Sequence, residues 1–489
     1  MNTSKGYHSF VAPIYLALLV VLAIGNAKAG PMRQEETDFA AIDAYITEQM
    51  DELGVPGMAL GVVQDGQIVH LQGFGAADSS GRAVTPQTPF YIGSVTKSFT
   101  ALAVMQLVEA GKIDLDAPVQ EYLPWFELAD KEASATITVR NLLNHASGIS
   151  EKDGNRFWAS EQGLEAFVRD FDKVQLSQPV GSTYQYSNIN FGIAGLIVEE
   201  VSGQPYTDYV TQHIFEPLDM RHATFSHESA LADGLSDGHH YIFGRPFRTA
   251  RASPPAGVPS GGLIASVEGM SHYVLAQLSE GRYGDNTILS ARGIEELHAP
   301  AVPKNPEENH YAMGWNAGTV DGIQAVWHGG NFGNFTSFIL LMPDRESGFI
   351  LLSNASGYEQ YDQFAQVSLG VFRLLNGNSA APIVSPPFYF RFLYWAILLT
   401  PFLQILLIVI GWLKRQSIKL WGVILTVALN VGAILLLFGL SQLIPFSLPS
   451  MLVFFPELGY GLIAIALLGV GWSTIYTLMY VHARRSKNG

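Results

Sequence analysis

The chain contains no cysteine. This absence excludes disulfide bonds, thiolate zinc sites and a cysteine nucleophile together. Charged side chains are also scarce, at 15% of the 489 residues, against about 25% in an average globular chain. Lysine and arginine number 28 against 43 acidic residues, so the net charge is −15. Because a nucleic-acid-binding protein is expected to carry a basic surface, this balance argues against nucleic acid as a partner.

Three apolar runs near the C-terminus explain the shortage of charge. They cover residues 392–413, 420–441 and 458–480 and contain no Asp, Glu, Lys, Arg or His. Each run is about twenty residues long, which is enough to cross a bilayer. Without an ionisable side chain they mark no ion or proton path. The sequence therefore predicts three transmembrane helices that act as an anchor more than as a transporter, with residues 381–391 as the linker that precedes them.

The positions of basic residues predict the orientation in the membrane. Lys414, Arg415 and Lys419 separate the first two runs, and Arg484, Arg485 and Lys487 follow the third. The positive-inside rule makes both clusters, and the tail 481–489, cytoplasmic. Three spans then place residues 30–380 outside the cytoplasm.

The first 29 residues predict the same side of the membrane. They read as a signal peptide, with Lys5, an apolar run over 10–25 and a small-x-small site at 27–29. An uncleaved anchor helix is the alternative interpretation. Both indicate a bacterial inner membrane protein with a periplasmic, or otherwise extracytoplasmic, domain. Residues 31–380 carry 42 acidic and 19 basic residues, a net charge of −23, which we attribute to solubility.

The order of elements predicts an α+β fold for the outer domain. Helical spacing covers residues 40–53, and strands at 58–63 and 67–73 flank Asp65-Gly66, a strong hairpin signal. A helix is predicted over 99–110, mainly helical segments and loops over 112–300, and a helix over 361–374. Strand signals return at 324–327, 335–341 and 348–352. An antiparallel sheet built from both ends of the domain, flanked by helices and with an all-α insertion, is the economical architecture.

The motif Ser94-Val95-Thr96-Lys97 is the only S-x-x-K in the chain. It falls where a loop meets the predicted helix, so Ser94 and Lys97 would share one helix face, a turn apart. A desolvated lysine loses its proton more readily and can activate a serine hydroxyl. Taken alone, the motif also fits an ordinary helix start.

Two further motifs carry groups suited to the same chemistry. In Tyr186-Ser187-Asn188 the phenol can shuttle a proton, and the amide of Asn188 can bind a substrate amide. In His328-Gly329-Gly330, at the end of a predicted strand, the glycines let a substrate backbone lie close. The backbone N–H groups of Asn331 and Ser94 would form an oxyanion pair. Taken alone, Tyr186-Ser187-Asn188 also fits a turn asparagine beside a half-buried tyrosine, and His328 also fits an ordinary histidine at a strand end.

Together, in this order, the three motifs resemble those of the penicillin-binding protein and class C β-lactamase superfamily of serine hydrolases. The resemblance covers about residues 40–375 and includes the runs 138–148, 215–220 and 259–263. It implies a β-lactamase/transpeptidase-like fold with Ser94 as nucleophile and Lys97 and Tyr186 as the proton-transfer pair. It also implies substrate binding by Asn188 and by the strand His328, Gly329 and Gly330. Which of Lys97 and Tyr186 is the initial base stays open.

Two departures narrow the resemblance. Many β-lactam-binding relatives carry lysine where His328 stands, and a histidine is mostly neutral at pH 7. The three-span tail is the second departure. In both features the sequence resembles the membrane-anchored prodrug-activating peptidases of nonribosomal peptide pathways, such as the colibactin-maturing peptidase. Those enzymes remove an N-acyl-D-asparagine cap. That likeness makes Asn331 and Asn334 candidate contacts for a side-chain amide, whereas residues 253–263 look like the wider superfamily.

The sequence thus predicts a membrane-anchored serine peptidase or amidase that releases an exported precursor. The alternatives are a D-alanyl-D-alanine carboxypeptidase, an esterase or a β-lactamase of the same superfamily, or a catalytically silent membrane sensor or scaffold. The expected partners are a small peptide or acylated peptide, membrane lipid and an exporter. No metal is predicted, because His239-His240 has no ligand at a suitable spacing, and no cofactor is needed for acyl transfer through serine.

Overall fold

The computed structural model describes residues 37–242, 244–304, 309–384, 388–413, 419–443 and 448–488. The chain divides into two compact units, one formed by Glu35–Val384 and one that contains the helices after residue 387. The predicted signal peptide lies outside the described residues, as do Lys414 and Arg415 of the first basic cluster.

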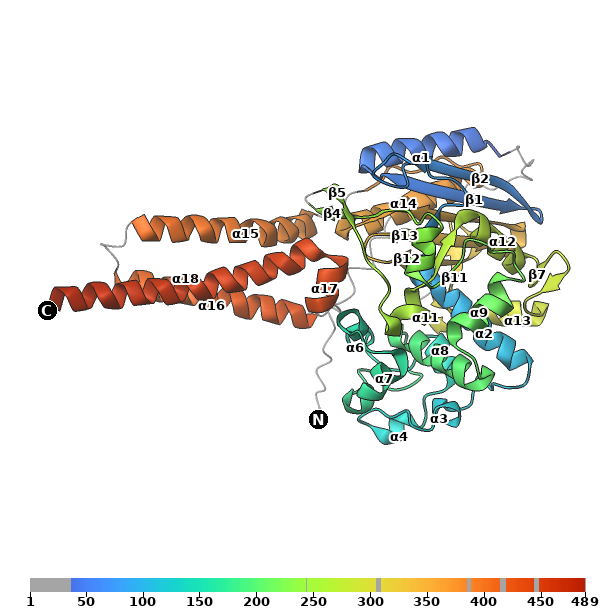
Figure 1. Cartoon of the computed structure of the whole chain (residues 1–489), viewed down its shortest axis with the longest axis horizontal. Coiled ribbons are helices and arrows are strands. Elements are labelled where there is room, and N and C mark those ends of the chain that lie inside the picture. The colour runs from blue at the N-terminus through green and yellow to red at the C-terminus, as the bar shows by residue number, and fades with distance from the viewer. Residues whose placement is uncertain are drawn as a thin grey trace, which may run out of the picture. The chain divides into compact units, whose positions relative to one another are not determined.

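The larger unit is built on an eight-stranded sheet whose neighbouring strands are all antiparallel (Figure 1). The strand order β2-β1-β14-β13-β12-β11-β10-β9 joins the two ends of the domain, because β1 pairs directly with β14. The predicted antiparallel sheet flanked by helices is confirmed. The strands are β1 (Gly57–Gln64), β2 (Gln67–Gly75), β9 (Val302–Pro303), β10 (Asn309–Tyr311), β11 (Asn316–Val320), β12 (Ile323–Asn331), β13 (Thr336–Met342) and β14 (Ser347–Ser353).

Alternating side chains of β1 divide the interior into two cores, as the period of two along a strand requires. Met58, Leu60 and Val62 pack with the helices α1 (Phe39–Leu53) and α14 (Tyr358–Leu375). Ala59 and Val63 belong to the larger core on the opposite face. Helix α12 (Val267–Leu278) covers that face against β1 and β14.

Helices are the main regular elements between β2 and β9, and two long buried helices carry the site. These are α2 (Thr96–Glu109) and α8 (Asn188–Ser202), which pack against each other. The other helices of this region are α3 (Val119–Tyr122), α4 (Lys131–Ser134), α5 (Val139–Leu143), α6 (Glu151–Gly154), α7 (Leu164–Arg169), α9 (Tyr206–Val210), α10 (His227–Ala232), α11 (Val258–Gly261) and α13 (Ala291–His298).

The predicted helical middle also holds short strands that the sequence analysis missed. They form a three-stranded sheet with the order β15-β4-β5 and two two-stranded sheets. Their bounds are β3 (Pro89–Tyr91), β4 (Gly238–Ile242), β5 (Arg245–Thr249), β6 (Ile264–Ser266), β7 (Arg282–Tyr283), β8 (Asn286–Thr287) and β15 (Ala355–Ser356).

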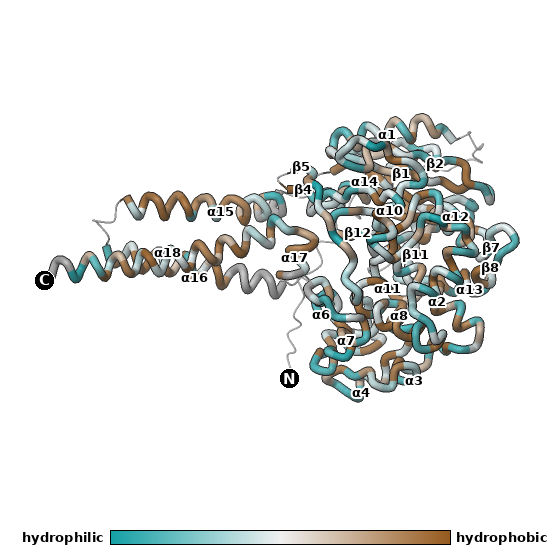
Figure 2. The backbone as a smooth tube through the Cα atoms, in the orientation of Figure 1, coloured by the Kyte–Doolittle hydropathy of each residue, from teal (hydrophilic) through white to brown (hydrophobic). Residues whose placement is uncertain are grey.

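In its described part, 388–413, 419–443 and 448–488, the second unit has four helices, three of them long and apolar (Figure 2). Amide side chains link these three: Gln404 Nε2 donates to Asn430 Oδ1 at 3.2 Å, and Asn430 Nδ2 donates to Ser473 Oγ at 3.1 Å. Such interhelical bonds are typical of helices packed in an apolar environment. The helices are α15 (Phe388–Leu413), α16 (Leu420–Leu443), α17 (Leu448–Phe454) and α18 (Pro456–Asn488).

The prediction of three spans needs correction. Among the described residues, two helices are long and apolar enough to cross a membrane by length and composition, Tyr394–Leu413 and Pro456–Arg485. By the same criteria Leu420–Leu435 of α16 counts as a shorter apolar helix.

Candidate active site

Ser94 lies in a single turn of 3₁₀-helix, Gly93–Val95, which joins β3 to α2. Gly93 has a φ of +51°, and a Cβ there would come within 2.6 Å of the backbone nitrogen of Asn331 on β12. Only glycine satisfies both conditions without displacing the strand. Thr96, the first residue of α2, fixes the turn, because its hydroxyl donates to the carbonyl of Gly93 at 2.7 Å. Ser94 is therefore fixed against the end of β12.

Lys97, one turn further along α2, is fully buried and directed at Ser94. Its Nζ lies 3.1 Å from Ser94 Oγ, 2.6 Å from Asn188 Oδ1 and 2.7 Å from the backbone carbonyl of Ser260. These partners come from the 3₁₀ turn before α2, from α8 and from α11. The shared helix face expected from the S-x-x-K spacing is present, with the amine and the hydroxyl in contact.

Tyr186 reaches the same serine from the segment that precedes α8. Its hydroxyl donates to Ser94 Oγ at 2.8 Å. The ring packs on the imidazole of His145, with 4.4 Å between the ring centroids. His145 is itself fixed, because its Nδ1 accepts from the backbone nitrogen of Ser187 at 3.2 Å. His145 belongs to the run 138–148, which resembles a segment of the superfamily. This run thus packs against the ring of Tyr186 and fixes its position.

Burial sets the protonation states of the amine and the phenol in opposite ways. It lowers the pKa of Lys97 well below 10.5, because the charged form of an amine is desolvated, and Glu151 opposes this shift only in part. Burial raises the pKa of Tyr186 far above 10, although its hydrogen bond to Ser94 acts against the shift. At neutral pH the phenol is therefore a proton donor, whereas the amine is the group that can lose its proton.

Nζ of Lys97 donates to three acceptors, Asn188 Oδ1, the Ser260 carbonyl and Ser94 Oγ. Asn188 Oδ1 and the Ser260 carbonyl can only accept, so each keeps one amine hydrogen in either protonation state. Loss of the third hydrogen would leave a lone pair on Nζ that faces Ser94 Oγ and can accept the serine hydrogen, while Oγ accepts from the Tyr186 hydroxyl. The geometry can thus draw the proton from Ser94 and return one through Tyr186.

His328 lies on β12 with its side chain 5% exposed. Its Nδ1 donates to the carbonyl of Gly329 at 2.7 Å, which leaves Nε2 to accept from the hydroxyl of Tyr311, 3.1 Å away. Burial and the nearby Lys97 lower the pKa of His328 to about 3. His328 is therefore neutral at physiological pH. Gly330 permits a close approach of β12 to the serine turn, since a Cβ there would come within 2.0 Å of the Ile92 carbonyl.

Two asparagines predicted as substrate contacts occupy different places. The backbone of Asn331 lies against Gly93, beside Ser94, as an oxyanion pair requires. Its side-chain Oδ1 accepts from the backbone nitrogen of Gly333 at 2.6 Å. Asn334 is 3% exposed, and its Nδ2 donates to the carbonyl of Thr249 on β5 at 2.8 Å. The structure does not bring the Asn334 side chain to Ser94, and its predicted role in substrate binding is left without support.

Four residues that the sequence analysis did not single out belong to this site. Asn155 Oδ1 accepts from Asn188 Nδ2 at 2.5 Å, and Ser260 supplies the carbonyl for Lys97. Glu151 begins α6, and burial raises the pKa of its carboxyl to about 7. Lys304 lies over the rings of Tyr184 and Tyr311, 5.1 and 5.9 Å from their centroids. Spacing gave no signal for them, because they lie far along the chain from the motif residues that they approach.

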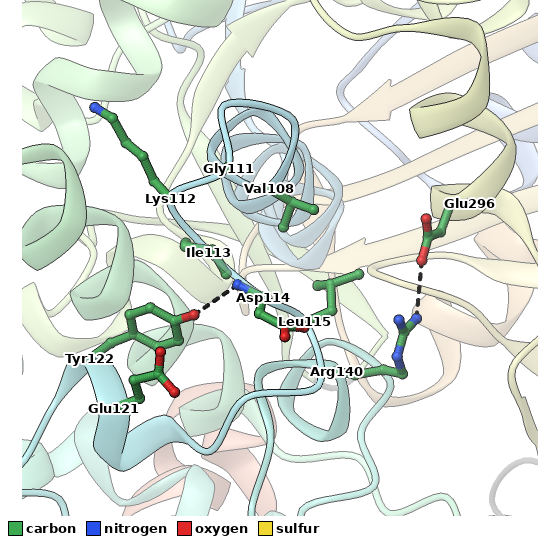
Figure 3. A pocket seen from close by; sticks show the side chains of 10 residues that line it. All are labelled: Val108, Gly111, Lys112, Ile113, Asp114, Leu115, Glu121, Tyr122, Arg140 and Glu296. Atoms are coloured by element: carbon green, nitrogen blue, oxygen red, sulfur yellow. Dashed lines mark hydrogen bonds and ion pairs between the residues drawn. The ribbon is translucent and has the colours of Figure 1, made fainter.

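A separate pocket of about 460 Å³ lies at the C-terminal end of α2 (Figure 3). Arg140 points to Glu296 across it, with 3.2 Å between Nη1 and Oε1, and the hydroxyl of Tyr122 accepts from the backbone of Asp114. None of the predicted site residues lines this pocket. We therefore assign the chemistry to the buried group around Ser94.

Comparisons with known proteins agree with this fold. Residues 42–369 match the Beta-lactamase family. Protein flp of Staphylococcus aureus strain MW2 is 28% identical over 317 residues, 64% of this chain and 62% of that protein. Unguisins hydrolase ungD' of Aspergillus campestris is 29% identical over 338 residues, 66% of this chain and 61% of that protein. The chain thus spans less than two thirds of the length of these relatives.

A solved structure is similar as well. The octameric penicillin-binding protein homologue from Pyrococcus abyssi superposes with a TM-score of 0.62 at 28% identity, over 74% of this chain and 82% of that one. The fold and the family match place the chain in the β-lactamase and penicillin-binding protein superfamily. The family match covers about two thirds of the chain, and the chain belongs to the Beta-lactamase family.

Proposed function

We propose that the chain is a membrane-anchored, extracytoplasmic serine peptidase or amidohydrolase that works through an acyl-enzyme on Ser94. The observation that carries the proposal is the position of Ser94 Oγ, 3.1 Å from the Lys97 amine and 2.8 Å from the Tyr186 hydroxyl. A hydroxyl held between a base and a proton donor is the arrangement that nucleophilic catalysis by serine requires.

The protonation states favour Lys97 as the initial base. Neutral Lys97 takes the Ser94 proton as Oγ attacks the substrate carbonyl, and the resulting oxyanion is stabilised by the backbone N–H groups of Ser94 and Asn331. Tyr186 donates its proton to the leaving nitrogen, and the proton that Lys97 took from Ser94 then returns to the phenolate, whose ring lies 4.9 Å from Nζ. Water then attacks the acyl-enzyme by the same route in reverse, which releases the acid.

The substrate that we propose is an exported nonribosomal peptide precursor from which an N-acyl-D-amino-acid cap, D-asparagine-like, is removed. Two observations support a substrate of this class. One relative is named a hydrolase of unguisins. His328 is neutral, so it gives no cation for the free carboxylate that a β-lactam or a D-alanyl-D-alanine C-terminus presents.

Hydrolysis by the detergent-purified chain tests this function, with Ser94→Ala as the control. The panel is an N-acyl-D-asparaginyl amide, its L-isomer, a D-alanyl-D-alanine peptide and a chromogenic cephalosporin. We expect Ser94-dependent cleavage of the D-asparaginyl amide alone. Cleavage of the D-alanyl peptide or the cephalosporin instead would move the protein into cell-wall or resistance chemistry.

One observation favours a second candidate, a carboxypeptidase or β-lactamase. Lys304 is a second cation close to His328, and burial lowers its pKa to about 8, so that it is mostly protonated at neutral pH. It can hold a substrate carboxylate in place of the missing lysine. Lys304→Gln distinguishes the candidates, because it would raise KM for the D-alanyl peptide and leave the D-asparaginyl amide unchanged. An esterase of the same superfamily is tested by adding an aryl ester to the panel.

A catalytically silent sensor or scaffold is the alternative from another class. The contacts between Ser94, Lys97 and Tyr186 speak against it, because a silent protein has no need of them. In cells, loss of the phenotype on Ser94→Ala supports catalysis, whereas an unchanged phenotype supports a scaffold.

We place the protein in the bacterial inner membrane, with the larger unit on the periplasmic side and the C-terminus in the cytoplasm. The apolar helices Tyr394–Leu413 and Pro456–Arg485 support an anchor by their length and composition. An exporter is the proposed source of substrate. Protease added to spheroplasts should digest Glu35–Val384 and spare a C-terminal tag, and the opposite pattern would reverse the orientation.

A further inference from the structure

The hairpin formed by β4 and β5 differs in charge from the rest of its unit. Residues 238–267 contain three arginines and no Asp or Glu, whereas residues 31–380 as a whole carry 42 acidic and 19 basic residues. All three arginines, Arg245, Arg248 and Arg251, fall within seven residues of β5 and the segment after it. A basic segment on an acidic domain points to an anionic partner.

The same hairpin exposes an aromatic side chain. Phe247 is 50% exposed between Arg245 and Arg248, which are both exposed. β5 is an edge strand of the sheet β15-β4-β5. Phe247 and Arg245 project from one face of β5, since residues two apart on a strand share a face. Arg248 has one acidic partner, Asp237 Oδ1, 2.8 Å from its Nη2.

The base of the hairpin is joined to the loop that follows β12. The backbone nitrogen of His239 donates to the carbonyl of Asn334 at 3.1 Å, and His240 Nδ1 donates to the carbonyl of Gly333 at 2.7 Å. Asn334 Nδ2 in turn donates to the carbonyl of Thr249 at 2.8 Å. The hairpin therefore cannot move without the loop between β12 and β13, which borders the candidate active site.

We propose that the β4–β5 hairpin docks the catalytic unit on an anionic lipid surface through Arg245, Phe247 and Arg248. Basic residues beside an exposed aromatic ring match the headgroup region, where anionic lipid attracts the former and the interface accommodates the latter. The occupant is lipid because the chain carries its own apolar helices. Nine residues lie in the sequence between Val384, where the larger unit ends, and Tyr394, where the first candidate span begins.

Docking at this hairpin would set the loop after β12 beside the bilayer. The candidate active site would then receive substrates that partition into lipid, as acylated peptides do, or that leave a transporter. The inference rests on the anchoring part of the proposed function and is independent of the reaction at Ser94.

The absence of cysteine permits a direct test. The full chain with Phe247→Cys, labelled with an environment-sensitive fluorophore, is placed in lipid nanodiscs of phosphatidylcholine alone or with phosphatidylglycerol. The matched control is Val69→Cys, which is 39% exposed and lies on β2, an edge strand of the eight-stranded sheet and not of the sheet that holds the hairpin. We expect a blue shift of the label at 247 that grows with phosphatidylglycerol, and none at 69.

Charge reversal separates lipid attraction from simple burial. Arg245→Glu with Arg248→Glu should abolish the blue shift, because each arginine near an anionic surface strengthens binding by about fivefold. Arg282→Glu on β7, 64% exposed, should leave it unchanged. A blue shift that ignores phosphatidylglycerol or survives the reversal, or one that requires an added acidic protein, would overturn the proposal.

Failure of the inference and failure of the proposed function can be told apart. Ser94→Ala in the labelled chain should keep the blue shift while hydrolysis is lost. Conversely, the charge reversal should leave turnover of a water-soluble substrate intact and slow that of a long-chain acylated one. Recovery of the chain free of the discs would refute the anchor itself.

Discussion

Replacement of Lys97 by methionine separates the role of this side chain in catalysis from its effect on stability. The two side chains are similar in length, but methionine has no proton to exchange and no donor for Asn188 Oδ1 or the Ser260 carbonyl. Loss of a general base costs about 10² to 10⁴ in rate, which corresponds to about 2.7 to 5.4 kcal/mol of transition-state free energy. We expect Lys97→Met to lower kcat/KM by that factor.

The effect on stability depends on pH in a direction that burial of the amine sets. The pKa of Lys97 is lowered in the folded chain, so between that pKa and 10.5 the unfolded chain binds one more proton than the folded one. Stability of the wild-type chain therefore rises with pH in this window, by about 1.4 kcal/mol per pH unit. Lys97→Met lacks this contribution. Its free energy of unfolding, relative to that of the wild-type chain, therefore falls by the same amount for each pH unit of increase.

Urea unfolding of both chains at several pH values between 8 and 10 measures that slope. Other groups titrate in both proteins and cancel in the difference. Lys112→Met is the matched control, because Lys112 is exposed and follows α2. A stability difference for Lys97→Met that is constant over this range would show that the amine is charged in the folded state, and Lys97 could then not be the initial base.

Three further substitutions test the supports of the site. Tyr186→Phe removes the hydroxyl that donates to Ser94 Oγ. Steady-state kinetics should show kcat/KM lowered by about 10²-fold or more for an amide and by less for an aryl ester, because an ester leaving group needs less protonation. Equal losses for the two substrates would contradict the role assigned to Tyr186. Gly93→Ala should abolish activity, because its Cβ would press on the Asn331 backbone, whereas a Cβ at Gly261 meets nothing closer than 3.7 Å and Gly261→Ala should stay active. Asn155→Leu should cost about 1 to 3 kcal/mol in the free energy of unfolding by leaving the Asn188 amide unpaired, and Asn155→Asp should restore most of it.

The parts of the fold that could be predicted are those whose signals are local. Asp65 and Gly66 have φ values of 50° and 70°, as a type I′ turn requires, and this dipeptide is the strongest hairpin signal in the sequence. The long strands β12, β13 and β14 carry runs of branched and aromatic residues that predict them. β10 and β11 were missed because they are short and contain asparagine and glycine. Only the pairing of β11 with β12 and of β10 with β11 makes them strands.

The candidate site divides in the same way. Ser94 and Lys97 could be paired from sequence because a helix fixes the distance between residues three apart. The contact between Asn155 and Asn188 joins residues 33 apart, and that between Lys97 and Ser260 joins residues 163 apart. Sequence spacing holds no record of either contact. On the sequence alone, we expect His328 to be mostly neutral at pH 7. Burial, which only the fold creates, lowers its pKa to about 3.

The distant partners of Lys97 explain why its helix is so deeply buried. A lysine amine loses its charge only where water is excluded, and there each of its hydrogens needs an acceptor from the protein. Helix α8 supplies one acceptor through Asn188 and α11 supplies the other through Ser260. Both helices must dock on α2 before Lys97 can act as a base. Catalytic competence and the packing of this core are thus one event, which is why weakening either contact should lower activity and stability together.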